Sequence, residues 1–142
     1  MDIELLSRED FNDRSRGEPA VHFDKRGAIY FNKAAVKHLF LFEKGVYFGV
    51  SLYHDPKHPH DFFVMRDDDR GWQLRGAEGG GARFNSASLA NHVIDTTWTM
   101  WCQSLAVGCV PAKPLTMGFR IARLPVDNDK NNNVYALIRK KV

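Results

Sequence analysis

The sequence predicts an α+β fold with antiparallel sheets and two helices, arranged as two pseudo-symmetric halves of the pattern strand-strand-helix-strand-strand. One observation is a repeated segment: residues 27–36 and 81–89 each read as a glycine turn, a short strand, Phe-Asn and a helix start. The copies lie roughly 50 residues apart, which favours a duplicated half-domain over a solenoid. The composition is globular, with 44% hydrophobic and 26% charged residues among 142, enough for one domain with a substantial core.

Each Phe-Asn pair is predicted to start a helix. Asn is a favoured N-cap because its side-chain oxygen accepts a backbone N–H that the first helical turn leaves unpaired. Asn32 and Asn85 are therefore the predicted caps. In each copy the residue before the cap and the fourth helical residue form a hydrophobic staple, which fixes the angle between strand and helix. These staples are Phe31 with Val36, and Phe84 with Leu89.

The first half is predicted from residue types that punctuate the chain. Alternating charges mark a polar N-terminal arm, Gly27 closes a hairpin, and apolar residues at helical spacing follow Asn32. Pro56 and Pro59 indicate an extended loop over residues 54–60. The predicted elements are the arm at 1–18, strands at 21–23 and 28–31, a helix at 33–42, and strands at 46–53 and 61–66.

The second half is predicted to follow the same order. Three consecutive glycines, residues 79–81, give a turn, and prolines at 111 and 114 end the second helix. The predicted elements are strands at 72–75 and 82–84, a helix from 86 to about 105, and a final hairpin with strands at 116–124 and 134–139. Residues 19–142 are thus one α+β domain, with half-repeats at about 20–70 and 72–140.

The segment from Asp24 to Leu39, with Gly45 after it, resembles the AbrB/MazE swapped-hairpin (looped-hinge helix) family. The resemblance covers residues 21–66 well and residues 80–139 loosely. It implies a swapped-hairpin-like pseudo-dimer built from one chain, and a DNA-binding regulator or antitoxin. The chain departs from the family at Ala28, where Arg is frequent, and at Asn32, where many members have a helix-starting Pro.

Basic residues near the turns and helix starts are the predicted nucleic-acid contacts. Cations on one side of a domain neutralise phosphates, so their affinity depends strongly on salt. The net charge is only +3, with a pI near 9.0, which permits an anionic partner without requiring one. The alternative is a set of solvated surface charges. The predicted contacts are Lys25, Arg26, Lys33, Lys37, Arg83, Arg139, Lys140 and Lys141.

Aromatic residues in the strands carry a related hypothesis, in which single-stranded bases stack on exposed rings. At the level of fold alone, four strands between two helices are also similar to Whirly-type single-strand binders. The alternative is that alternating aromatic side chains fill the core face of a sheet. The rings concerned are Tyr47, Phe48, Tyr53, Phe62 and Trp72.

The remaining clusters of histidine, aspartate and glycine favour structural roles over metal binding or catalysis. His54, His58 and His60 have a spacing that could converge on zinc, but two prolines favour a plain loop. The acidic run at 67–69 lacks calcium-loop spacing, and the glycine-rich stretch at 76–81 lacks phosphate-loop spacing. We therefore predict no metal, no cofactor, no catalytic residue and no enzyme.

The predicted function is a nucleic-acid-binding protein, specifically a small DNA-binding regulator. The alternative is a non-catalytic protein-interaction or assembly module of a phage or mobile element, which requires a contiguous apolar patch. A protein partner or a homodimer fits either hypothesis. We expect no membrane partner, since no apolar run approaches ~20 residues. A cytoplasmic location is expected, because the N-terminus lacks a signal-peptide pattern and two cysteines in an apolar stretch suit a reducing compartment.

Overall fold

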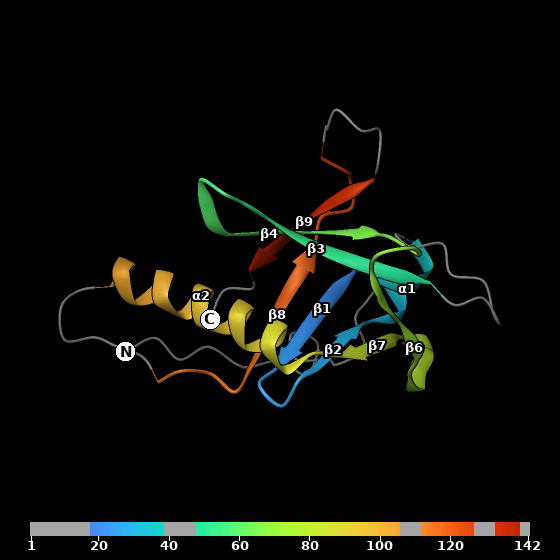
Figure 1. Ribbon diagram of the computed structural model, residues 1–142, viewed down its shortest axis with the longest axis horizontal. Helices are drawn as coiled ribbons and strands as arrows, with labels where there is room; N and C mark the ends of the chain where they lie inside the picture. Colours follow the sequence, from blue (N-terminus) through green and yellow to red (C-terminus); the bar gives the residue numbers. More distant parts are fainter. Residues whose placement is uncertain (1–17, 39–47, 106–111, 127–132, 140–142) are drawn as a thin grey trace, which may run out of the picture.

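A computed structural model describes residues 18–38, 48–105, 112–126 and 133–139 (Figure 1). It contains two α-helices, one short 3-10 helix and nine strands in these ranges. Their bounds are β1 (Ala20–Asp24), β2 (Ala28–Phe31), α1 (Lys33–His38), β3 (Gly49–Asp55), β4 (His58–Arg66), β5 (Trp72–Gln73), β6 (Arg75–Gly76), η1 (Glu78–Gly80), β7 (Ala82–Asn85), α2 (Ala87–Ser104), β8 (Thr116–Ile121) and β9 (Val134–Arg139).

The nine strands form one antiparallel sheet in the order β5-β3-β4-β9-β8-β1-β2-β7-β6. Its first and last members, β5 and β6, are separated in the chain only by Leu74. Leu74 is buried, and its N–H donates to the carbonyl of Phe48 at 2.9 Å. The two ends of the strand order therefore meet at one residue, and the sheet curls into a nearly closed barrel.

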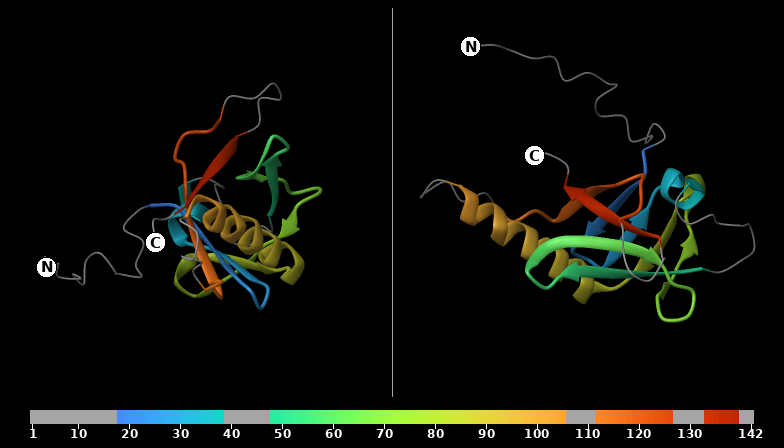
Figure 2. Two further views of the ribbon diagram at one scale, coloured as in Figure 1. Left: turned by 90° about the vertical axis from the view of Figure 1, so that its left-hand side faces the viewer. Right: turned by 90° about the horizontal axis from the view of Figure 1, so that it is seen from above.

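Helix α2 lies on the concave side of this sheet, which curves around it (Figure 2, left). Its buried residues, Ala90, Val93, Ile94 and Thr97, recur at helical spacing and so form one face. The strands alternate buried and exposed positions, and their buried side chains meet this face in a single core. Phe23 on β1 illustrates the packing, with its ring perpendicular to that of a β8 phenylalanine at 5.6 Å.

The predicted fold class is wrong. The molecule is mostly antiparallel sheet in a nearly closed barrel with two helices, and not an α+β pseudo-dimer of two swapped-hairpin-like halves. The order of elements along the chain follows the prediction, but the two segments expected to be separate halves interleave. β1 pairs with β8, β2 with β7, β3 with β5 and β4 with β9. The helices also differ, with 6 and 18 residues.

One of the two predicted helix caps is confirmed. Asn32 Oδ1 accepts the N–H of Ala35 at 2.9 Å, the expected N-cap bond, and Phe31 and Val36 both lie in the core. At the second junction the cap is Ser86, whose hydroxyl accepts the N–H of Leu89. Asn85 is instead the last residue of β7, so the predicted staple of Phe84 with Leu89 is wrong as well. The predicted extension of the first helix to residue 42 lies outside the described residues.

The predicted loop over residues 54–60 is replaced by the ends of two strands. β3 continues to Asp55 and β4 begins at His58, leaving a two-residue turn at 56–57. Asp55 Oδ1 accepts the N–H of Lys57 and stabilises this turn. Among the described residues, no helix is both long and apolar enough to cross a lipid bilayer.

Candidate nucleic-acid interface

A row of five residues crosses the outer face of the barrel from β6 to β8. Arg75 lies opposite Arg83, Arg83 opposite Tyr30, Tyr30 opposite His22, and His22 opposite Gly118. Directly opposed residues of a sheet project from the same face. They face outward because the residues that alternate with them on β1, β2, β7 and β8 are buried. We call this set the cross-strand row. It spans four strand spacings, about 19 Å.

Two arginines stand side by side at one end of the row. Arg75 and Arg83 are exposed, and within the described part of the chain neither side chain has an ion pair or hydrogen bond. Like charges directly opposite each other destabilise a sheet. The pair therefore makes no evident contribution to folding, and its two guanidinium groups are available to an anion.

Lys33 extends the positive charge beyond the strands. Its methylene carbons Cδ and Cγ lie 3.1 and 3.2 Å from the position that a Cβ on Gly80 would occupy. Gly80 has a φ of 87°, in the left-handed region that glycine tolerates best. The 3-10 helix η1 thus supports the stem of Lys33 beside β7, while the residue itself is exposed.

Tyr30 occupies the centre of the row and leans over Gly81. Its hydroxyl oxygen and Cζ lie 2.5 and 2.7 Å from the position of a would-be Cβ on Gly81. The absence of a side chain at Gly81 therefore makes room for the ring. Tyr30 is half-buried, flanked by Arg83 on one strand and His22 on the other.

The structure brings together only some of the predicted basic contacts. Lys33 and Arg83 adjoin or belong to the row, and exposed Lys37 lies one helical turn from Lys33. Lys25 and Arg26 are exposed in the turn at the opposite end of β2, about 20 Å from Lys33 along the chain direction.

Arg139 does not join this surface. It lies opposite Phe119, on the inner face of the sheet, and its guanidinium carbon is 4.4 Å from the centre of the Trp101 ring. Burial lowers the pKa of Arg139 from its usual value. The guanidinium group of Arg139 therefore packs on a ring of α2 and is not part of the cross-strand row. Lys140 and Lys141 lie outside the described residues.

Sequence reasoning missed Arg75, Tyr30 and His22. The alternation of outward and inward residues was visible in each short strand. The missing information was the pairing of β2 with β7, which are far apart in the chain, and of β6 with β7. Without those registers, no local pattern places a tyrosine beside two arginines.

The aromatic residues proposed for stacking divide into core and surface. Phe48 and Phe62 are buried, which confirms the core interpretation for these two. Trp72 is 38% exposed, but one side of its ring stacks on Phe84 at 5.4 Å. Tyr53 is 45% exposed on the outer face of β3. Tyr47 lies outside the described residues.

A different part of the barrel surface is apolar. Two adjacent rows of hydrophobic residues cross the outer face of β3, β4 and β9. The second row continues to Val126, which follows β8 and pairs with Val134 in an isolated bridge. All of these residues are partly or largely exposed. We call this set the apolar outer face; it consists of Tyr53, Phe63, Met65, Val126, Val134 and Ala136.

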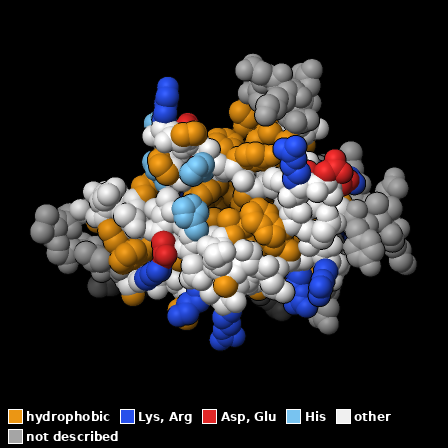
Figure 3. All heavy atoms as spheres, in the orientation of Figure 1, with side chains coloured by type: hydrophobic (Ala, Val, Ile, Leu, Met, Phe, Trp, Pro, Cys, Tyr) orange, Lys and Arg blue, Asp and Glu red, His pale blue; other side chains and the backbone are white. Residues whose placement is uncertain are grey.

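The histidines do not converge on a metal site. His58 Nδ1 lies 3.2 Å from Asp55, His60 Nε2 lies 3.7 Å from Asp61, and the ring of His54 is 6.5 Å from that of His92 on α2. In the described ranges no group of three or more His, Cys, Asp or Glu side chains is arranged to hold a metal. Figure 3 shows histidine and hydrophobic side chains in the middle of one face, with Lys and Arg side chains around its margin.

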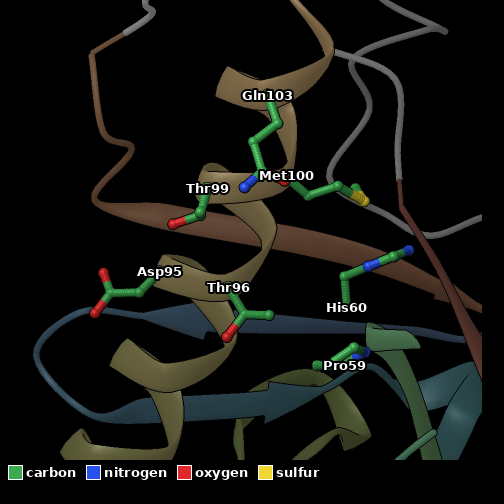
Figure 4. A pocket seen from close by; sticks show the side chains of 7 residues that line it. All are labelled: Pro59, His60, Asp95, Thr96, Thr99, Met100 and Gln103. Atoms are coloured by element: carbon green, nitrogen blue, oxygen red, sulfur yellow. The ribbon is translucent and has the colours of Figure 1, made fainter. Parts of the chain in front are cut away.

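A pocket lies between β4 and α2, but it offers no acid–base pair (Figure 4). Asp95 points away from His60, and its carboxylate pairs with Lys113. The other lining side chains include no nucleophile with an adjacent base. The lining residues are Pro59, His60, Asp95, Thr96, Thr99, Met100 and Gln103.

The acidic run at 67–69 is a structural turn. The carboxylate of Asp67 accepts hydrogen bonds from the N–H of Arg70 and the hydroxyl of Ser51, both at 2.9 Å. These bonds lower the pKa of Asp67. Asp68 pairs with Arg66, which lowers the pKa of Asp68, and accepts the N–H of Gly49. These carboxylates thus bind β3 to the turn between β4 and β5.

Comparisons with known proteins add no family assignment. A scan against protein-family models, a search of curated proteins and a search of solved structures each found no match to this chain. The resemblance to the AbrB/MazE family therefore stays a prediction.

Proposed function

We propose that this chain is a nucleic-acid-binding protein, acting as a small DNA-binding regulator in the cytoplasm. The observation that supports the proposal most is the directly opposed pair Arg75 and Arg83, exposed beside Tyr30 and without a carboxylate partner among the described residues. Lys33 and Lys37 add positive charge next to β7. Phosphate groups match the fork of an arginine, and binding them releases condensed counterions.

The proposal is tested by measuring the salt dependence of DNA binding by fluorescence anisotropy. Each phosphate contact to a duplex adds about 0.9 to the slope of log affinity against log salt, and each contact to a single strand adds about 0.7. The double variant Arg75→Ala/Arg83→Ala should lower the slope by about 1.5 to 2 and weaken binding at least tenfold at low salt. The double variant Lys33→Ala/Lys37→Ala should act in the same direction, because its two side chains lie beside the row.

Lys57→Ala is the control, because Lys57 is an exposed cation in the β3–β4 turn. Its removal changes net charge but should leave the slope within experimental error. If the unmodified protein fails to bind DNA at low salt, the proposal is refuted. The same holds if the arginine double variant binds as the Lys57 variant does.

The second candidate function, a protein-interaction or assembly module, is favoured by the apolar outer face. Contiguous apolar surface on a soluble domain commonly marks an interaction site. Phe63 and Met65 lie near its centre, on β4. Sedimentation velocity of the protein with and without Phe63→Lys tests the homodimer form of this idea. A dimer that dissociates in the variant supports it, and a monomer at every concentration in the unmodified protein contradicts it.

A further inference from the structure

We infer that the cross-strand row binds a single-stranded polynucleotide, with a base stacked on Tyr30 and the phosphates on one side of that base held by Arg83 and Arg75. This inference rests on the proposed function and specifies its ligand. It chooses between the two forms of nucleic acid that the proposed function leaves open, a duplex and a single strand. The argument has two parts, the elements that a duplex requires and the surface that a single strand requires.

In the part of the chain that the structure describes, neither helix has the properties of a groove-reading helix. The major groove of a duplex admits an α-helix or a two-stranded ribbon, whose side chains then reach the base edges. α2 contains no Lys or Arg among its 18 residues, carries Asp95, and buries one face in the core. Within the described residues, α1 spans six residues, about 9 Å or fewer than two turns.

The cations lie instead on the face of a sheet. Arg75, Arg83 and Tyr30 come from three adjacent strands and point outward together. Such a surface is broader than a ribbon and cannot enter a groove of about 12 Å. Unpaired bases can be splayed onto a sheet face, where aromatic rings stack them without regard to sequence.

The order of side chains in the row suits a single strand. Tyr30 has cations on one side, at Arg83 and Arg75, and His22 on the other. A base on the ring would place the phosphates on the β7 side of that base near the guanidinium groups. Gly118 ends the row without a side chain to obstruct the strand. The cross-strand row is about 19 Å long, whereas four nucleotides stacked at duplex spacing span roughly 14 Å. The row is therefore long enough to contact four nucleotides.

The test compares three probes of one sequence by anisotropy at low salt: a fluorescein-labelled 12-nucleotide DNA strand, the same strand as RNA, and the DNA duplex. We expect the single strands to bind at least tenfold more tightly than the duplex. Tyr30→Leu should weaken single-strand binding about tenfold, since base–aromatic stacking is of that size. Tyr30→Phe keeps the ring and should stay within about twofold. The DNA and RNA arms decide which polymer is preferred.

A measurement on the unmodified protein guards against a variant that fails to fold. A strand carrying 5-iodouracil is irradiated in the complex, and the crosslinked peptide is identified by mass spectrometry. A crosslink in the peptide that contains Tyr30 supports the inference. A crosslink confined to other elements overturns it.

The outcomes separate the two proposals. Duplex binding equal to or tighter than single-strand binding, weakened by Arg75→Ala/Arg83→Ala, overturns the single-strand inference and leaves DNA binding standing. Unchanged affinity in Tyr30→Leu, with the thermal midpoint preserved, also overturns the stacking role alone. The absence of binding to all three probes overturns both proposals.

Discussion

Gly81 illustrates how one missing side chain positions the centre of the proposed interface. A Cβ at this residue would lie 2.5 Å from the carbonyl oxygen of Phe31 and 2.5 Å from the hydroxyl of Tyr30. Real Cβ atoms essentially never approach other atoms so closely, and the carbonyl belongs to the backbone of β2. Glycine is therefore required by the close approach of β2, which also lets the Tyr30 ring lie over the chain.

Gly81→Ala should destabilise the protein by about 1–3 kcal/mol, the usual cost of inserting a methyl group into a packed site. Urea unfolding followed by circular dichroism measures the change. Gly76→Ala is the matched control, since nothing lies within 4 Å of its would-be Cβ. The control should be neutral or about 0.5 kcal/mol more stable, because alanine restricts the unfolded chain. Equal losses in both variants would contradict this account of Gly81.

Asp67 gives the protein a predictable response to acid. Its hydrogen bonds from Arg70 N–H and Ser51 hold the pKa of its carboxyl below the ordinary value of 3.8. A lowered native pKa adds stability that is fully present above 3.8 and is lost as pH falls through the native value. Asp67 is only partly buried, so solvent screens its charge and the contribution is small.

The thermal midpoint should therefore fall less between pH 5 and pH 3 in Asp67→Asn than in the unmodified protein. Differential scanning calorimetry across this range checks the expectation. Asp69→Asn removes the same charge from the same turn, at a residue whose side chain shows no hydrogen bond in the described ranges. Parallel pH profiles for the two variants would argue against the role assigned to Asp67.

At the scale of elements, the two helix starts show what a local sequence pattern determines. Asn32 is buried and makes three side-chain hydrogen bonds: its oxygen accepts from Ala35 and Ala20, and its nitrogen donates to the carbonyl of Glu18. Asn85 occupies the corresponding place in a similar segment, but it is an exposed strand residue. The cap of α2 falls one position later, on Ser86.

Alanine substitutions at Asn32, Ser86 and Asn85 should distinguish the two helix caps from the strand residue. Asn32→Ala should cost about 2–4 kcal/mol, because it removes a cap and leaves a buried N–H of Ala20 without its acceptor. Ser86→Ala should cost about 1 kcal/mol, and Asn85→Ala less than about 0.5 kcal/mol, as for an ordinary surface change. Chemical denaturation ranks the three variants. A larger loss from Asn85→Ala than from Ser86→Ala would show that the cap of α2 is misplaced.

Local signals predicted most strands and both helices, and some of their limits. Branched and aromatic residues between turn signals gave the correct limits for the strands at 28–31 and 134–139, whereas the strand predicted over 116–124 ends at Ile121. Pro56 and Pro59 predict a loop over residues 54–60, but the structure has the ends of two strands there. Pro56 sits in a tight turn, and Pro59 is tolerated near the start of β4.

At the scale of the whole molecule, pairing between distant segments determined the fold and the candidate site. The sequence could predict that Tyr30 and Arg83 face away from the core, since each alternates with buried neighbours. It could not predict that they lie side by side, because a strand of four residues carries little information about its partner. The same gap caused the two related segments to be interpreted as separate halves, when β2 and β7 in fact pair directly.

A substitution at Leu74 tests whether the barrel unfolds as one cooperative unit, because Leu74 is the only residue between β5 and β6. Leu74→Ala should cost about 2–5 kcal/mol, the range for a buried leucine. Tryptophan fluorescence, which reports on β5 and α2, and far-UV circular dichroism should shift together, since one core contains Leu74, α2 and residues of the seven longer strands. Two separated transitions in the variant would instead indicate independently folding parts.

The near closure of the barrel also restricts how any partner binds. Each of the seven longer strands has a hydrogen-bonded neighbour on both sides, and the two short ones are consecutive in the chain. Around Tyr30, β1 and β2 are paired on both sides along nearly their whole length, so little backbone remains there for an incoming peptide to extend the sheet, which is a common route to both recognition and aggregation. A ligand on the cross-strand row must therefore be recognised through projecting side chains, and changes to those side chains should alter binding while the ladder of main-chain hydrogen bonds stays intact.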